Sequence, residues 1–214
     1  MNDKETAKRE DRADNTCTKV YTDGSGVGGQ IGAAAVLYRD GMMVSSRRMR
    51  LGSLRHHTVF EGEGVGLILG VELVREEEEA EGMVTMGIDN IAAITATHTI
   101  KPSPSHHIWD TFHRRVEMLY NKHKGVDLLV KWVPSHMGIL GNEKADEEAK
   151  KAALEGSSPI NKLPAPLRKT LPRSKSVTHQ EFMHKLRNTA EQLWKKLPRY
   201  KKLAHIDPTL KLNS

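Results

Sequence analysis

The chain has 214 residues, of which 37% are hydrophobic, so it can form one sizeable domain with additional segments. No apolar run approaches the ~18 residues that span a membrane, and the charged N-terminus lacks the apolar core of a signal peptide. The single cysteine, Cys17, excludes an intramolecular disulfide and a cysteine-based zinc site, and it agrees with an intracellular location in nucleus or cytoplasm.

The net charge of +6 is distributed unevenly along the chain. Residues 155–214 contain 13 Lys/Arg and 4 Asp/Glu, whereas residues 1–154 contain 20 and 23. The basic C-terminal part indicates a polyanionic partner, and the alternative interpretation is a solvated linker. Residues 1–15 are densely charged, and we therefore expect them to be disordered.

The stretch "VYTDGSGVGGQ" has two incompatible interpretations. The first predicted strand, "TKVYTD", ends at Asp23, and Gly24–Gly29 is then predicted to turn the chain. Alternatively, Gly24, Gly26 and Gly29 match G-x-G-x-x-G, the spacing of a dinucleotide-binding loop. That loop requires a helix directly after its last glycine and an acid about twenty residues further on.

The residues after this stretch favour a strand. Asp40-Gly41 lies between two runs that carry apolar residues, which is a strong hairpin signal. Ile31–Arg39 and "MMVSSRRMRL" are therefore predicted to be paired strands. Asp40 also comes too soon to be the acid of a dinucleotide site.

Helices and strands alternate through the rest of the domain. "TVFEGEGVGLILGVELVREEEE" is predicted to be a helix, because its apolar residues Val65, Ile68, Leu69 and Leu73 have a helical period and its glycines allow close packing. "GMVTMGID" is predicted to be a strand that ends at Asp89, and "NIAAITAT" a short helix that the prolines of Lys101–Ser105 break.

A helix over 106–125, a strand "VDLLVKWVP" and a final helix to about Leu154 complete the order. The pattern predicts an α/β domain over residues 16–155 with a mixed five-stranded sheet, in which the first three strands are antiparallel and the others parallel, flanked by helices.

The sequence changes character after this domain. Residues 156–176 are rich in proline and basic residues and are predicted to be an extended linker. Residues 177–214 are predicted to be a basic tail that can form an amphipathic helix, with Phe182, Leu186, Leu193 and Trp194 as its apolar residues.

Acidic residues follow the strands of the predicted sheet. Asp23 and Asp89 end strands whose carboxyl ends meet at one edge, and acids on the first helix and at Asp146 can reach that edge. Gathered carboxylates repel each other and are stable together with cations such as Mg²⁺. Two such ions activate a water in phosphodiester hydrolysis. Taken singly, each acid also has a structural interpretation as a turn residue, a helix cap or an exposed helix acid.

Four motifs together resemble a known family. "YTDGS", "TVFEGEGVGLILGVE", "MGIDNIAAI" and "WVPSHMGILGNEKADEEAK" are similar to the motifs of type 1 ribonuclease H, especially the ribonuclease H domains of retroelement polyproteins. The resemblance covers about Thr16 to Leu154. It implies a ribonuclease H-like fold and an endonuclease that cleaves the RNA strand of RNA/DNA hybrids with two Mg²⁺ or Mn²⁺ ions. The implied catalytic residues are Asp23, a glutamate, Asp89 and Asp146 as metal ligands, and His136 as an auxiliary group.

Glu61 and Glu63 compete for the glutamate position. In the family the catalytic glutamate lies nine residues before a second glutamate on the same helix, and Glu72 has that spacing from Glu63. We therefore choose Glu63 and interpret Glu61 as a first-turn acid favoured by the helix dipole. The adjacent pairs His56-His57 and His106-His107 are interpreted as surface or helix-start residues.

The predicted partner is an RNA/DNA hybrid, recognised by its 2′-hydroxyls and phosphates. The predicted substrate contacts are Gly24, Ser25, Asn90 and Asn142. Two features depart from the family: Ser135 stands where glycine often precedes the histidine, and residues 101–115 supply few basic side chains. The basic tail either adds phosphate contacts or is a remnant of a longer retroelement polyprotein, and we favour the remnant.

Three other functions are alternatives to hybrid cleavage. A catalytically inactive nucleic-acid-binding remnant of the same fold has the same sequence motifs. A DNA nuclease such as an integrase or junction resolvase is disfavoured by "GNEKAD" and His136. A nicotinamide-dependent dehydrogenase is disfavoured by the hairpin after the opening glycines.

Overall fold

The computed structural model describes residues 4–99 and 105–206, and these residues divide into two compact units. The first unit is Met1–Ser174 and the second is Lys175–Ser214. Within the described residues, no helix combines the length and the apolar character that crossing a bilayer demands. The elements of the first unit are α1 (Lys4–Ala13), β1 (Thr18–Val27), β2 (Gln30–Arg39), β3 (Met42–Ser53), α2 (Val59–Glu76), β4 (Gly82–Ile88), α3 (Ile91–Thr97), α4 (His106–Lys122), β5 (Val126–Trp132), α5 (Leu140–Glu155), η1 (Ile160–Lys162) and η2 (Ala165–Arg168).

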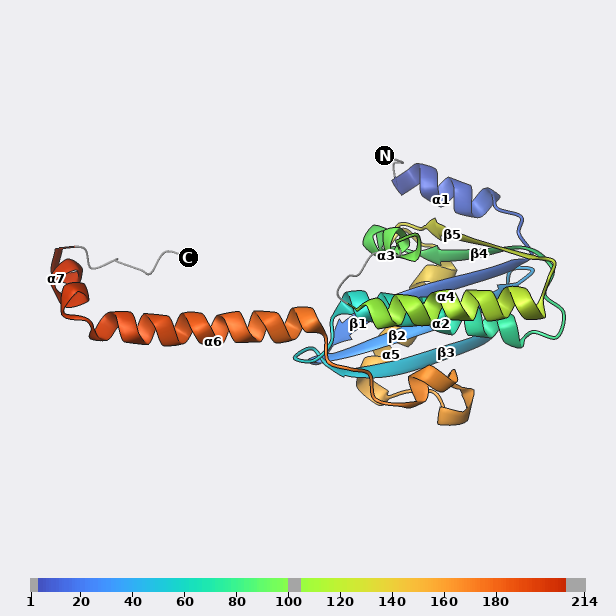
Figure 1. Cartoon of the computed structure of the whole chain (residues 1–214). Coiled ribbons are helices and arrows are strands. Elements are labelled where there is room, and N and C mark those ends of the chain that lie inside the picture. The colour runs from blue at the N-terminus through green and yellow to red at the C-terminus, as the bar shows by residue number, and fades with distance from the viewer. Residues whose placement is uncertain (1–3, 100–104, 207–214) are drawn as a thin grey trace. The chain divides into compact units, whose positions relative to one another are not determined.

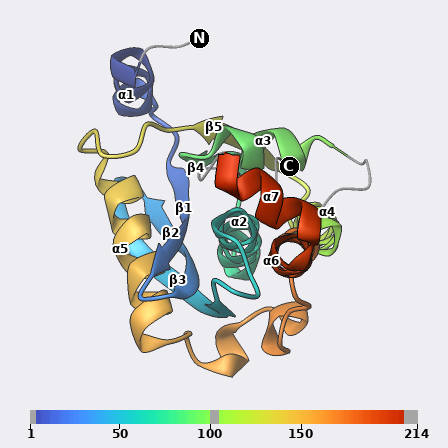
Figure 2. The ribbon, with the colours of Figure 1, turned by 90° about the vertical axis from the view of Figure 1, so that its left-hand side faces the viewer.

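The sheet has the order β3-β2-β1-β4-β5 (Figure 1). β1 pairs antiparallel with β2, and β2 with β3, whereas β4 runs parallel to both β1 and β5. The predicted mixed sheet is therefore confirmed. α2 and α4 cover one face and α5 covers the other (Figure 2).

The glycines of α2 bring the helix close to the sheet. Gly62, Gly66 and Gly70 lie four residues apart and therefore on one side of the helix. A Cβ at Gly70 would lie 2.6 Å from the Met86 side chain, and a Cβ at Gly66 would lie 3.1 Å from the backbone oxygen of Asp23. Residues 61–74 are all buried, because the sheet lies on one side of α2 and α4 on the other. The close packing predicted for these glycines is confirmed.

The prediction that β1 ends at Asp23 is wrong. β1 continues to Val27, and the turn to β2 consists of Gly28 and Gly29, whose φ angles are 59° and 75°. Glycine adopts these left-handed angles without strain. A strand, not a helix, follows, which excludes the dinucleotide-loop interpretation. The second hairpin is confirmed: Asp40 and Gly41 have φ angles of 50° and 77° between β2 and β3.

Two segments predicted to lack structure are ordered, which corrects those predictions. Lys4–Ala13 forms α1, which is attached to the sheet because Asp11 and Asp14 form ion pairs with Lys131 of β5. Residues 160–168 form η1 and η2 and bury Leu163 and Leu167 against the core cluster. Alternating proline and leucine thus produce a packed strap where composition alone predicts a linker.

Over residues 175–206, the described part of the second unit, the chain forms two helices, α6 (Lys175–Lys196) and α7 (Pro198–Ile206). The predicted tail helix is therefore present, but it ends before Pro198, which lacks the N–H that would continue the ladder. Most of the predicted helix break at Lys101–Ser105 lies outside the described residues, as do residues 207–214.

Candidate active site

Three carboxylates gather at one edge of the sheet. Asp23 comes from β1, Glu63 from α2, and Asp89 follows β4. One oxygen from each lies within 4.8 Å of the others, a spacing that can hold a metal ion. Asp23 and Glu63 are 6% and 3% exposed, whereas Asp89 is half-buried.

Strand register places the two aspartates together. The parallel pairing of β1 with β4 ends at Thr22 and Ile88, so Asp23 and Asp89 are the next residues on neighbouring strands. β4 stops there, whereas β1 continues and has an open edge on that side. The Trp132 indole N–H donates a hydrogen bond of 3.1 Å to the backbone oxygen of Asp89 and holds the end of β4.

A glycine contact brings Glu63 to this edge from the other face. A Cβ at Gly24 would lie 2.3 Å from the backbone nitrogen of Glu63, so α2 can approach β1 here only over a glycine. Gly24 therefore faces α2, and because side chains alternate along a strand, Asp23 faces α5. The open edge of β1 lets Glu63 reach around to Asp23.

Glu61 has a different role from Glu63. It forms a capping box with Thr58, in which each residue's side chain accepts a hydrogen bond from the other's backbone N–H. Ser105 donates a further hydrogen bond of 2.7 Å to Glu61, and His57 lies 3.6 Å away. The structure thus joins Glu63, and not Glu61, to the two aspartates. His57 is 4% exposed, so it is not a surface residue, but it directly precedes the N-cap Thr58 and therefore agrees with the helix-start interpretation.

The electrostatics of the three carboxylates favour a bound cation. Burial, followed by the charges of Asp23 and Asp89, raises the pKa of Glu63 to about 9. Burial, followed by the charges of Asp89 and Asp146, raises the pKa of Asp23 to about 7. Asp23 Oδ2 and Glu63 Oε2 are buried and have no hydrogen-bond partner among the described residues. Buried carboxylate oxygens without donors match the hard oxygen ligands that Mg²⁺ prefers.

Asp146 borders this group without joining it. It lies on α5 and is absent from the set of oxygens within 4.8 Å. Its side chain is 27% exposed and accepts a hydrogen bond of 2.5 Å from Lys150, one turn further along α5. Burial raises the pKa of Asp89, and the charge of Asp146 is the next largest cause. Asp146 is therefore near enough to act electrostatically on the other acids.

The other predicted site residues surround the carboxylates. Asn90 caps α3 by accepting a hydrogen bond from the Ala93 N–H, and its amide lies 3.5 Å from Glu63 Oε1. Asn142 is buried, and its hydrogen bond to Asp89 opposes the rise in pKa of that acid, as does the nearby charge of His136. His136 is exposed on the loop before α5, with a φ of 56°.

The glycine-serine pair after Asp23 lies within β1. The nearby Gly24 backbone lowers the pKa of both Asp23 and Glu63, against the larger effect of burial. Ser25 is 9% exposed and pairs with Gly32 of β2. Their predicted contacts with nucleic acid stay predictions.

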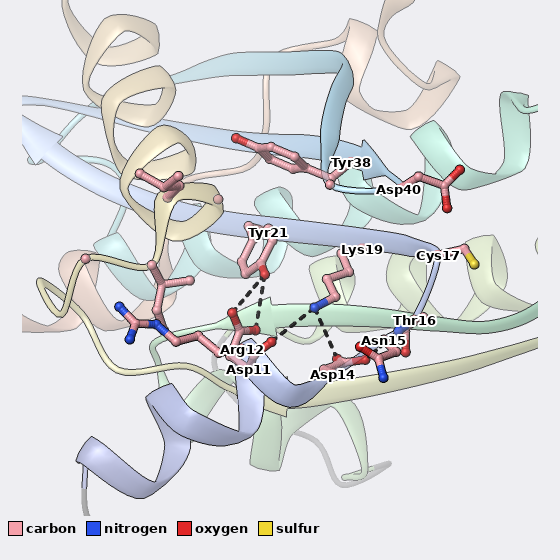
Figure 3. A pocket seen from close by; sticks show the side chains of 15 residues that line it. Asp11, Arg12, Asp14, Asn15, Thr16, Cys17, Lys19, Tyr21, Tyr38 and Asp40 are labelled. Carbon is pink, nitrogen blue, oxygen red and sulfur yellow. Dashed lines mark hydrogen bonds and ion pairs between the residues drawn. The ribbon is translucent and has the colours of Figure 1, made fainter.

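A polar network beneath the His136 loop has no signal in the sequence. The Tyr21 hydroxyl lies 3.1 Å from both carboxylate oxygens of Asp11, and Lys19 reaches the Asp11 backbone oxygen (Figure 3). The Tyr21 ring lies against Gly141, where a Cβ would approach it to 2.2 Å. A cavity of about 490 Å³ opens beside this network, and none of the four predicted acids lines it. Because Tyr21 is two residues before Asp23, its position on the same strand face was predictable, but Asp11 as its partner was not.

Comparison with solved structures identifies the arrangement of elements. A ribonuclease H1 isolated from compost by a metagenomic approach is similar over 64% of this chain and 96% of its own, with 17% identity and a TM-score of 0.51. The chain has the ribonuclease H fold. A foamy viral protease–reverse transcriptase in complex with RNA/DNA hybrid is similar over 63% of this chain and 20% of its own, with 15% identity and a TM-score of 0.51.

The ribonuclease H1 of Halobacterium salinarum is similar over 63% of this chain and 96% of its own, with 21% identity and a TM-score of 0.49. No protein-family model matches the chain, and no curated protein matches its sequence. At these identities the likeness establishes the ribonuclease H fold, while activity has to be argued from the site itself.

Proposed function

We propose that the chain is a metal-dependent endonuclease that hydrolyses the RNA strand of RNA/DNA hybrids. The observation that carries this proposal is the carboxylate group of Asp23, Glu63 and Asp89, with two buried oxygens that lack partners among the described residues. The RNA/DNA hybrid bound by the foamy viral neighbour supports the choice of substrate.

The carboxylates would hold the metal, with Asp146 as the outer ligand. Two bound Mg²⁺ or Mn²⁺ ions would supply an activated water and stabilise the leaving 3′ oxygen. The side chains of Asp23 and Glu63 come from opposite faces of β1, so together they can coordinate a cation at the open edge of that strand. Asp146 is paired with Lys150 but is partly exposed, so its side chain has room to turn toward the site when a cation neutralises the repulsion between the acids.

The groups around the acids position the reaction. Asn142 fixes one side of Asp89, and the Trp132 indole fixes its backbone. His136 is exposed on the loop before α5, where an imidazole can transfer a proton or assist product release near neutral pH. Gly24, Ser25, Asn90 and Asn142 are the proposed contacts to the substrate.

Cleavage of a hybrid with a labelled RNA strand tests the proposal. We expect cleavage with Mg²⁺, none with EDTA, and a loss of at least about a hundredfold in rate for Asp23→Asn and Glu63→Gln, because each removes a charged metal ligand. Asp127→Asn is a matched control, since Asp127 is exposed on β5 away from the carboxylates. Duplex DNA and duplex RNA serve as competing substrates.

Two outcomes would refute the proposal. If Glu63→Gln cleaves at the wild-type rate, the assignment of Glu63 is wrong. If the wild-type chain binds the hybrid but does not cleave it with Mg²⁺ or Mn²⁺, the catalytically inactive nucleic-acid-binding remnant is the correct function.

A further inference from the structure

The net charge of the chain belongs entirely to its second unit. Of the 33 Lys/Arg and 27 Asp/Glu, residues 175–214 hold nine and three, which leaves 24 of each in residues 1–174. The unit that carries the carboxylates is therefore electrically neutral overall. It offers no net attraction to a polyanion, whereas the second unit, with a net charge of +6, does.

The cations of the two units also differ in their partners. In the first unit, Arg47 is paired with Glu76 at 2.7 Å, and many other basic side chains are paired with acids in the same way. Along the described part of α6 and α7, Lys195 is paired with Glu191, whereas Lys196, Arg199 and Lys202 are exposed and have no ion pair. These unpaired cations are available to an external anion.

The basic residues cluster around the bend between the two helices. Lys195 and Lys196 end α6, and Arg199 and Lys202 lie in α7. The rings of Trp194 and Tyr200 are 5.9 Å apart, and backbone hydrogen bonds continue across the bend. The bend thus keeps the cations of both helices in one cluster.

The last residue of the first unit is fixed in the fold of that unit. Ser174, the last residue of the first unit, is 1% exposed and donates a backbone hydrogen bond of 2.7 Å to His56. His56 lies two residues before Thr58, the N-cap of α2, and Glu63 follows about 8 Å further along that helix. α6 has 22 residues and is therefore about 33 Å long, close to one helical turn of a nucleic-acid duplex.

Of the two interpretations of the basic tail, we propose the phosphate contacts: residues 175–206 form a basic arm that binds the phosphate backbone of the nucleic acid without reading its sequence. The inference rests on the proposed function, because it assigns binding of the substrate of that function to the arm. Phosphate neutralisation by Lys and Arg is independent of bases and weakens steeply with salt. The neutral first unit then selects and cuts the strand that the arm retains.

Equilibrium binding of a fluorescein-labelled RNA/DNA hybrid of about two helical turns tests the arm. The full chain is titrated in EDTA, so that no cleavage occurs, across about 50 to 200 mM salt. Three variants are compared with the wild type: the arm variant K195Q/K196Q/R199Q/K202Q, its charge-preserving counterpart K195R/K196R/R199K/K202R, and the control R114Q/K124Q/K162Q/K169Q, which removes the same charge from exposed positions of the first unit.

The arm variant should bind about tenfold or more weakly at about 100 mM salt, with a log–log salt slope shallower by up to about 3.6, since each lost phosphate contact removes about 0.9. The charge-preserving variant should bind like the wild type. Equal affinity and slope for the arm variant and the wild type would overturn the proposal, as would an equal loss in the control.

Two further measurements distinguish this inference from the proposed function and from self-association of the chain. If the wild type cleaves the hybrid and the arm variant has the same KM, the proposed role of the arm is wrong and the proposed function is unaffected. If the chain binds the hybrid through the arm but does not cleave it, the proposed function is wrong and the role of the arm is unaffected. Sedimentation addresses a second copy as the partner. If F182S/L186S abolishes self-association of the chain and hybrid binding does not depend on the arm charges, α6 is a dimerisation helix instead.

Discussion

Replacing Glu63 with glutamine should stabilise the metal-free protein, although it removes a proposed catalytic group. The pKa of Glu63 is about 9 in the folded protein, because of burial and the charges of Asp23 and Asp89, and 4.5 is its ordinary value. At pH 7 the unfolded chain carries an ionised Glu63 and the folded chain a protonated one. Each pH unit between the two values costs about 1.4 kcal/mol, so at pH 7 the penalty is about 3 to 4 kcal/mol.

Glutamine has the shape of the protonated acid and avoids this cost. A gain of about 3 kcal/mol corresponds to a rise in Tm of roughly 6–12 °C for a chain of this size. A group with a raised folded pKa contributes stability that is full below 4.5 and is lost as pH rises toward about 9. The advantage of Glu63→Gln should therefore vanish near pH 4.5 and grow up to about pH 9.

Thermal unfolding in EDTA at several pH values measures this difference, and Glu61→Gln is the matched control on the same helix. Burial would raise the pKa of Glu61, but the neighbouring His57 and the hydrogen bond from Ser105 outweigh it and lower the pKa. Glu61→Gln should therefore destabilise the protein at neutral pH and do less as the solution becomes acidic. Mg²⁺ should then raise the Tm of the wild type more than that of Glu63→Gln. A Glu63→Gln variant that is less stable than the wild type in EDTA, or equally affected at all pH values, would refute the reasoning.

Three further substitutions probe how the site is supported. Gly24→Ala should lower the free energy of unfolding by more than about 2 kcal/mol and reduce cleavage, because its Cβ would lie 2.3 Å from the Glu63 nitrogen. Gly29→Ala is the control: its Cβ would meet open space, so it should cost only about 1 kcal/mol for its φ of 75° and leave cleavage unchanged. Urea unfolding and the hybrid cleavage assay measure both variants. Tyr21→Phe removes the hydroxyl bound to Asp11 and should lower the free energy of unfolding by about 1–2 kcal/mol; a neutral result would show that Lys131 alone satisfies Asp11. Leu167→Ala should cost about 2–5 kcal/mol in thermal unfolding, and an unchanged Tm would mean that the strap of η1 and η2 does not belong to the core.

The sequence predicts the sheet well because its signals are local. Asp40-Gly41 sets a hairpin through its left-handed backbone, and the helical period of α2 follows from which residues face its neighbours. The end of β1 was mispredicted because glycine has two uses. Gly24 looks like a turn residue in the sequence, but in the fold it is a strand residue that makes space for α2.

Features that depend on distant partners were not predictable in this way. Asp11 has no periodic or motif signal, and its place follows from Tyr21 and Lys131, which lie 10 and 120 residues along the chain and meet it only in the folded structure. Likewise, the proline-rich strap reads as a linker until the apolar surface that buries Leu163 and Leu167 is known. The carboxylate group falls between these cases, because strand order predicts that Asp23 and Asp89 meet and the spacing to Glu72 selects Glu63, but the glycine contact that brings Glu63 to them appears only in the fold.

The same glycine contact links the stability of the domain to its proposed chemistry. α2 can place Glu63 at the open edge of β1 only by packing tightly, and tight packing excludes the water that would screen three neighbouring carboxylates. In the metal-free domain the three carboxylates therefore repel one another where α2 packs closely on β1, and a bound cation would remove this repulsion. Because the charges of the first unit balance overall, attraction of a polyanion to the chain then depends on a separate basic segment. The proposed division of labour follows from this charge distribution: the neutral first unit would cleave the hybrid, and the basic second unit would retain it.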